Sequence, residues 1–219
     1  MHIAAHCPPQ TRSRWWLLAA GLATVMLLAA CGFALRGVAP LPFSTFYIGL
    51  GDNTRFGAEV RRSIQAASPD TRIVPKASEA DAILQVVKNE RTLREVSLNA
   101  QGRVEEYELG INFTFRVITS KGVAILPDTT LSVYRDMPYD DQVLQAKEIQ
   151  TENLYESMQQ ALVERLIRRL TAPEVHTAYK KAINDKDTAD TPVYDPNVEV
   201  VDERPASWTT PRLPGAGSW

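Results

Sequence analysis

Histidine and cysteine, the side chains that most often act as bases, nucleophiles and metal ligands, are scarce in this chain of 219 residues. The three histidines are His2, His6 and His176, and the two cysteines are Cys7 and Cys31. The segment between Cys31 and His176 therefore contains neither an imidazole nor a thiol. This excludes from it a histidine-dependent triad, a cysteine nucleophile and a Cys/His zinc site. We expect no catalytic residue, no metal ligand and no bound cofactor, so the chain is predicted not to be an enzyme.

Carboxylates and glycines are the remaining candidates for chemistry. Paired carboxylates that cleave glycosides must converge on a cleft about 5 to 9.5 Å apart. Glu106 and Glu108 instead alternate along one predicted strand face, where solvated acids are expected, and Asp140 and Asp141 suit the start of a helix. The GLG segment at residues 49–51 lacks the third glycine of a dinucleotide-binding loop and the lysine of a P-loop. A solvated strand face and an ordinary turn explain these residues.

Near the N-terminus, one cysteine does have a predicted chemistry. Arg12 and Arg14 precede an apolar run over residues 15–30, which is shorter than the ~20 residues of a membrane-spanning helix. The run leads into LAAC at residues 28–31, which fits the bacterial lipobox at the end of a secretory signal. We expect cleavage before Cys31 and covalent acyl and diacylglycerol groups on it, because several acyl chains together anchor a protein stably. An uncleaved anchor helix with an incidental cysteine is the alternative.

The net charge argues against a nucleic-acid partner. The chain has 24 Lys and Arg against 26 Asp and Glu, a formal charge of −2, whereas phosphate binding requires a surplus of basic residues. Hydrophobic residues make up 44% of the chain and charged residues 23%, which is ordinary for a globular protein.

The chain divides into three predicted parts. Residues 1–30 are the signal peptide, and residues 31–172 form one folded domain whose boundary lies at Thr171 or Ala172. Residues 173–219 are acidic and rich in proline, so they bury too little apolar surface to offset the entropy of ordering. They are predicted to be a disordered tail, with a helical extension allowed as far as Tyr179.

Hydrophobic periodicity predicts the elements of the folded part. The expected elements are a strand at 43–50, a helix at 54–67, strands at 82–98, 107–117 and 123–135, and a helix at 140–170. Alternation is clearest at Tyr107, Leu109, Ile111, Phe113, Phe115 and Val117, and four-residue spacing is clearest at Leu154, Met158, Leu162, Leu166 and Leu170. The order βαβββα predicts an α+β fold. In it, two helices pack on one face of a four-stranded, mostly antiparallel sheet whose first two strands are parallel.

Four short segments resemble one family of bacterial lipoproteins. They are CGFALR at residues 31–36, GRVEEY at 102–107, Tyr134-Arg135 followed after an acidic loop by Ala146-Lys147, and ERLIRRL at 164–170. Together they are similar to the LPS-assembly lipoprotein family LptE, and they span residues 31–170. The resemblance implies a lipoprotein on the periplasmic side of the outer membrane, with which Gly32 after the cysteine agrees. It also implies that the domain plugs and helps assemble the LptD β-barrel and takes part in lipopolysaccharide transport to the outer leaflet.

The resemblance also implies basic residues that bind lipopolysaccharide. Phosphates accept short, charge-assisted hydrogen bonds from lysine and arginine. The family's basic positions lie in the turn between the middle strands and just before the long helix, where Lys147 matches the second. The turn at residues 99–102 has no basic side chain, and Arg103 directly after it is the candidate substitute. For both residues an ordinary solvated charge is the alternative.

Two other functions remain open from the residues alone. One is an outer-membrane lipoprotein whose small domain binds peptidoglycan or another lipid without a barrel partner. The other is a lipid-anchored periplasmic hydrolase, which the missing histidines and scattered acids disfavour. A tightly bound barrel would distinguish the plug from both.

Overall fold

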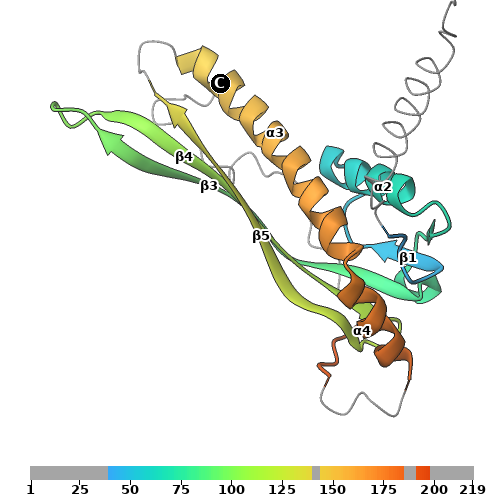
Figure 1. Cartoon of the computed structure of the whole chain (residues 1–219). Coiled ribbons are helices and arrows are strands. Elements are labelled where there is room, and N and C mark those ends of the chain that lie inside the picture. The colour runs from blue at the N-terminus through green and yellow to red at the C-terminus, as the bar shows by residue number, and fades with distance from the viewer. Residues whose placement is uncertain (1–38, 140–143, 185–190, 198–219) are drawn as a thin grey trace, which may run out of the picture. The chain divides into compact units, whose positions relative to one another are not determined.

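The computed structural model describes residues 39–139, 144–184 and 191–197, which form one sheet with helices packed on it (Figure 1). The expected signal peptide, Cys31 and the end of the tail lie outside the described residues, as do Asp140 and Asp141. In chain order the elements are β1 (Thr45–Ile48), α2 (Arg55–Ala67), β2 (Arg72–Ile73), a 3-10 turn (Ala77–Glu79), β3 (Ala82–Leu98), β4 (Val104–Thr119), β5 (Ala124–Pro138), α3 (Leu144–Leu170) and α4 (Pro173–Ile183). None of the helices within these ranges is long and apolar enough to cross a membrane.

Within the described residues the sheet has five strands in the order β2-β1-β3-β4-β5. β1 pairs in parallel with β3, as the strand–helix–strand order predicts, and β3, β4 and β5 form an antiparallel meander. The α+β prediction is confirmed, but the predicted number of four strands is wrong. The additional strand is β2, whose two residues pair in parallel with Thr45 and Phe46 of β1. Two residues cannot show an alternation, so periodicity misses such a strand.

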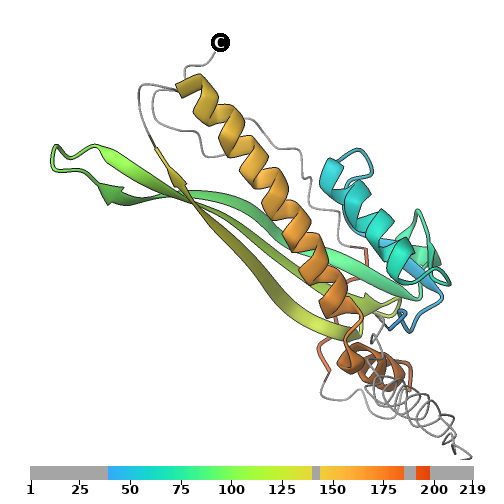
Figure 2. The same ribbon diagram turned by 45° about the horizontal axis from the view of Figure 1, so that its top comes forward.

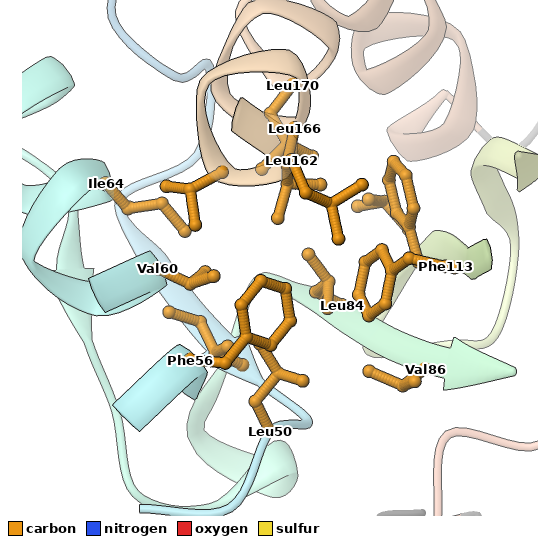
Figure 3. Packing of buried hydrophobic residues seen from close by; sticks show 14 of the residues in the cluster. Leu50, Phe56, Val60, Ile64, Leu84, Val86, Phe113, Leu162, Leu166 and Leu170 are labelled. Carbon is orange, nitrogen blue, oxygen red and sulfur yellow. The ribbon is translucent and has the colours of Figure 1, made fainter. Parts of the chain in front are cut away.

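The main hydrophobic core lies between the sheet and helices α2 and α3, which pack side by side on one face (Figure 2). Figure 3 shows the labelled core side chains converging: Phe56, Val60 and Ile64 of α2, Leu162, Leu166 and Leu170 of α3, and Leu84, Val86 and Phe113 of the sheet. The alternation predicted for β4 is confirmed, because the six apolar side chains that define it are all buried. Burial of each large apolar side chain contributes about 1.5–3 kcal/mol, so this layer holds the fold together.

The start of α2 follows from one residue. Thr54 is the N-cap, and its Oγ1 accepts a hydrogen bond from the backbone N–H of Gly57 at 3.0 Å. The helix predicted over residues 54–67 is therefore confirmed, with Thr54 as its N-cap. A capping hydroxyl satisfies one of the backbone donors that the first helical turn leaves without a partner.

Helix α4 continues past the predicted boundary at Thr171 or Ala172 and past Tyr179, the residue to which the prediction allowed a helical extension. Residues 173–183 are helical, and Val175 and Ala182 are buried in the main core. The ring of Tyr179 contacts Phe43 with centroids 5.7 Å apart. Proline at the first helical position favours a helix start because its missing N–H is not needed there. A short apolar face at the beginning of a mostly polar segment is enough to join it to the core.

The three long strands have two distinct ends (Figure 1). The turn at residues 99–103 joins β3 to β4, and we call this end the tip. The turn at residues 120–123 joins β4 to β5 near β1, and we call this end the base. The sheet face opposite the main core carries every second residue of β4 from Glu106 to Arg116. We call it the open face, since helices α2 and α3 lie on the other side.

Candidate functional site

Arg103 lies at the tip, directly after a turn that the chain holds in one conformation. Gly102 has φ +75°, in the left-handed region that glycine adopts without strain. The Asn99 side chain accepts hydrogen bonds from the backbone N–H of Gln101 at 3.0 Å and of Arg103 at 2.9 Å. These bonds fix the backbone of the turn, and the residue Arg103 is exposed.

Lys147 lies in the first part of α3 at the same end of the sheet. Its Nζ donates to the carbonyl of Pro138 at 2.8 Å and to Gln150 Oε1 at 3.2 Å. Pro138 pairs with Glu106, and the next residue, Tyr139, donates its backbone N–H to Glu105. These contacts place Lys147 beside the beginning of β4, which Arg103 precedes. An ammonium has three donor hydrogens, and these two contacts with described residues use two of them.

Three apolar side chains that neighbour Arg103 or Lys147 in the sequence are exposed. Val96 is 50% exposed, Leu98 is 58% exposed and Ile149, near Lys147 in α3, is 68% exposed. No pattern in the sequence singles them out. Val96 lies where the register between β3 and β4 shifts, and such bulges redirect side chains in a way that strict alternation cannot predict. Cationic and apolar groups together suit an amphiphilic anion.

The open face is lined with polar side chains that contact one another across the strands. Asn112 Oδ1 accepts from Ser132 Oγ at 2.7 Å and from Tyr134 Oη at 3.1 Å, and the hydroxyls of Thr114 and Thr130 lie 2.8 Å apart. Ion pairs stand towards either end, Arg94 with Glu108 at 2.8 Å and Arg116 with Asp128 at 2.7 Å. The face is therefore wet and polar over much of its length, as the alternation in β4 predicts.

The structure does not assemble the weaker chemical candidates. Glu108 is paired with Arg94 rather than with Glu106, so the two acids form no catalytic dyad. Among the described residues, no group of three or more His, Cys, Asp or Glu could hold a metal ion. A Cβ on Gly49 would lie 2.7 Å from the carbonyl oxygen of Leu84. Close packing of β1 on β3, and not phosphate binding, therefore explains this glycine.

A buried tyrosine holds the tip half of β3 to helix α3. The hydroxyl of Tyr155 donates to the carbonyl of Thr92 at 2.8 Å, and the Arg91 guanidinium lies 4.6 Å from the ring centroid. Burial raises the pKa of Tyr155 to about 12, against the opposing effect of Arg91. Tyr155 is therefore neutral at physiological pH and acts as a structural donor.

A family model and two related proteins that match this chain all carry one family name. Residues 43–170 match the model of the LptE family, described as lipopolysaccharide-assembly. The LPS-assembly lipoprotein LptE of Yersinia pestis (strain Pestoides F) is 30% identical over 189 residues, covering 85% of this chain and 87% of that protein. The LPS-assembly lipoprotein LptE of Pectobacterium atrosepticum is 27% identical over 161 residues, covering 73% and 86% respectively.

Solved structures show the same architecture. An uncharacterized lipoprotein B from Nitrosomonas europaea superimposes with a TM-score of 0.55 at 32% identity, covering 64% of this chain and 91% of that one. The rare lipoprotein B from Shewanella oneidensis gives a TM-score of 0.52 at 22% identity, covering 61% and 98%. The second likeness concerns the fold alone.

Proposed function

The chain belongs to the LptE family of lipopolysaccharide-assembly proteins, and we propose that it works there as a plug within an LptD β-barrel. Members of the family are outer-membrane lipoproteins that serve assembly and are not enzymes. The proposed activities are to help assemble the barrel and to help deliver lipopolysaccharide to the outer leaflet. In the complex, the domain would lie largely inside the barrel on the periplasmic side of the membrane.

The polar open face supports the plug proposal. Barrel interiors are polar, and side chains such as Asn112, Thr114 and Tyr134 present hydroxyl and amide groups on this face. Hydrogen bonds among these groups orient them before a partner arrives, which lowers the entropic cost of docking. We therefore assign the open face as the surface that meets the lumen wall.

The tip supports a contact with lipopolysaccharide. Arg103 and Lys147 lie at one end of the sheet and offer guanidinium and ammonium donors for phosphate. The exposed side chains of Val96, Leu98 and Ile149 at the same end offer apolar surface for acyl chains. This combination is the observation that carries the proposed ligand class.

We further propose that Cys31 carries the lipid anchor. The described chain becomes fixed at Leu41, whose backbone N–H donates to the buried hydroxyl of Ser68 at 2.9 Å. Leu41 is the tenth residue after Cys31, and a fully extended chain spans at most ~3.6 Å per residue. The anchor would thus tether the domain within about 36 Å of the membrane surface. A Cys31→Ser variant should therefore incorporate no labelled fatty acid, whereas the parent chain should, and equal labelling of both would contradict the anchor.

Affinity purification from detergent-solubilised outer membranes, followed by mass spectrometry, tests the plug. A tagged chain should recover a heat-modifiable LptD barrel in equal amount. Recovery of the lipoprotein alone, with LptD present in the same extract, would contradict the plug. That result would favour the alternative, an outer-membrane lipoprotein with a small ligand-binding domain and no barrel partner.

A charge-reversal pair tests the ligand contacts. The Arg103→Glu, Lys147→Glu variant should lose binding to purified lipopolysaccharide in vitro, because acidic side chains repel its phosphates. Arg62→Glu is the matched control, since Arg62 is an exposed arginine on α2 that pairs with Glu59 of its own helix. Normal binding by the double variant would remove the assignment of these two residues.

A further inference from the structure

A segment beyond α4 returns to the base of the sheet and pairs with it (Figure 1). We call residues 191–197 the strap. Val193 forms an antiparallel bridge with Val123, flanked by two backbone hydrogen bonds. Tyr194 donates its N–H to the carbonyl of Gly122 at 2.8 Å, and Ala124 donates to the carbonyl of Pro192 at 2.9 Å. The strap thus begins to add a strand next to the first residues of β5.

Side chains of the open face then hold the strap. The ring of Tyr194 lies against the guanidinium of Arg116, 4.0 Å from ring centroid to Cζ, which is the geometry of a cation–π contact. Gln85 Nε2 donates to the carbonyl of Asp195 at 2.6 Å. The strap therefore leaves the edge of the sheet and is held by residues of β3 and β4.

Beneath the strap lies an apolar patch that interrupts the polar open face. The patch is a second hydrophobic cluster, separate from the main core, made of Val74, Ala80, Ile83 and Ile118. Tyr47 and Tyr194 pack against it. Tyr194 therefore makes three kinds of contact: its backbone pairs with Gly122, its ring lies against the Arg116 guanidinium, and it packs on the apolar patch.

These features are those of a site that recognises an extended peptide. Sheet edges bind such peptides through backbone hydrogen bonds, while pockets for single side chains supply specificity. Most of the bonds to the strap use its backbone, and Val193 is 69% exposed, so another extended segment with one aromatic residue could make the same contacts.

We propose that the base of the sheet is a strand-docking site which the strap fills in the free protein, and that an extended, aromatic-bearing segment of the barrel partner displaces the strap. The displacement rests on the proposed function, because the plug proposal places the barrel partner on the open face. The strap acts as an internal competitor, which keeps the apolar patch covered until the partner arrives. An internal segment competes through its effective concentration, so a partner segment with additional contacts can replace it.

A pair of glycine variants tests whether the strap docks at all. Gly122 and Gly102 have φ +83° and +75°, so alanine causes similar backbone strain at both. A Cβ on Gly122 would overlap the carbonyl of Tyr194, whereas a Cβ on Gly102 would have no heavy atom within 4 Å. Hydrogen exchange of the whole chain should show the Tyr194 amide exchanging about ten-fold faster in Gly122→Ala and unchanged in Gly102→Ala. Equal Tyr194 rates in both variants and the parent would overturn the docked strap.

A disulfide lock tests the displacement. Val123 and Val193 are paired residues, so the Val123→Cys, Val193→Cys variant should form a bond that keeps the strap in place. Copurification should then recover about ten-fold less barrel than with the matched Val123→Cys, Val193→Ser variant, which cannot lock. Equal recovery would overturn displacement while leaving the plug intact. Failure of the parent chain itself to recover the barrel would overturn both.

Discussion

Two turns at opposite ends of β4 have similar backbones but very different surroundings. Gly102 at the tip and Gly122 at the base both adopt a positive φ. A side chain on Gly102 would project into open space, whereas one on Gly122 would meet Tyr194 of the strap. Both turns thus reverse the chain with a glycine at positive φ, but the turn at the tip is exposed and the turn at the base is covered by the strap.

The two ends also differ in packing, since neighbouring elements cover the base more than the tip. The base lies among β1, β2 and α4, and a second hydrophobic cluster adds a layer on the open face. The tip carries exposed Val96 and Leu98, and the hydrogen bond from Tyr155 of α3 reaches β3 only at Thr92, nearer the middle of the strand. Buried side chains therefore supply most of the stability, whereas the tip leaves apolar side chains exposed to solvent.

The largest predicted change in stability comes from comparing two truncations, one of a core side chain and one of a side chain at the tip. Phe113 is completely buried in the core, whereas Leu98 is 58% exposed at the tip. Phe113→Ala should lower the free energy of unfolding by about 3–5 kcal/mol, because it removes apolar burial and leaves a cavity. Leu98→Ala should change it by about 0.5 kcal/mol or less.

Urea denaturation of both variants measures the two changes. A similar loss of stability in each would contradict the division between a stabilising core and an available tip. Binding of lipopolysaccharide gives the complementary readout, since Leu98→Ala should weaken it if the tip contacts acyl chains.

A glycine in the middle of β4 provides the next test. A Cβ on Gly110 would overlap Oγ1 of Thr92 and lie 3.0 Å from the ring of Tyr134 on the neighbouring strand. Gly110→Ala should therefore cost about 1–3 kcal/mol through overpacking. In a Thr92→Ala background the cost should fall, because the nearest obstacle is gone. An equal cost in both backgrounds, measured by denaturation, would show that the steric explanation is wrong.

Tyr155→Phe tests the attachment of the tip half to α3 and carries a pH signature. Loss of the hydrogen bond to Thr92 should cost about 1 kcal/mol at neutral pH. The pKa of Tyr155 rises from 10.0 to about 12 on folding, so its stabilising contribution is complete below pH 10 and is lost as the pH rises towards 12. The stability gap between parent and variant should therefore narrow over that interval. A gap that stays constant in pH-dependent denaturation would contradict this burial effect.

The smallest predicted effect is a difference in coupling energy between two ion pairs of the open face. Arg94 at the tip has a side chain that is 72% exposed, whereas Arg116 at the base is 18% exposed and also contacts Tyr194. A double-mutant cycle should give less than about 0.5 kcal/mol for Arg94 with Glu108. The coupling of Arg116 with Asp128 should be larger, because solvent screens it less. The reverse order would contradict the picture of a covered base.

Strictly local patterns in the sequence determined the elements and their main faces. The alternation from Tyr107 to Val117 places one row of β4 in the core, and the repeat from Met158 to Leu170 does the same for α3. Both patterns are periods of the backbone itself, so neighbouring residues are enough to detect them. The segments that resemble the LptE family likewise pointed to the family that residues 43–170 match.

Tertiary structure alone decided the features that depend on distant residues. The pairing of β2 with β1, the docking of the strap on Arg116 and the hydrogen bond of Tyr155 with Thr92 all join segments far apart in the chain. The register shift after Val86 moves Arg91 and Leu93 onto the row that Ile111 and Leu109 occupy. Such pairings and bulges follow from packing across the whole sheet, and no local period records them.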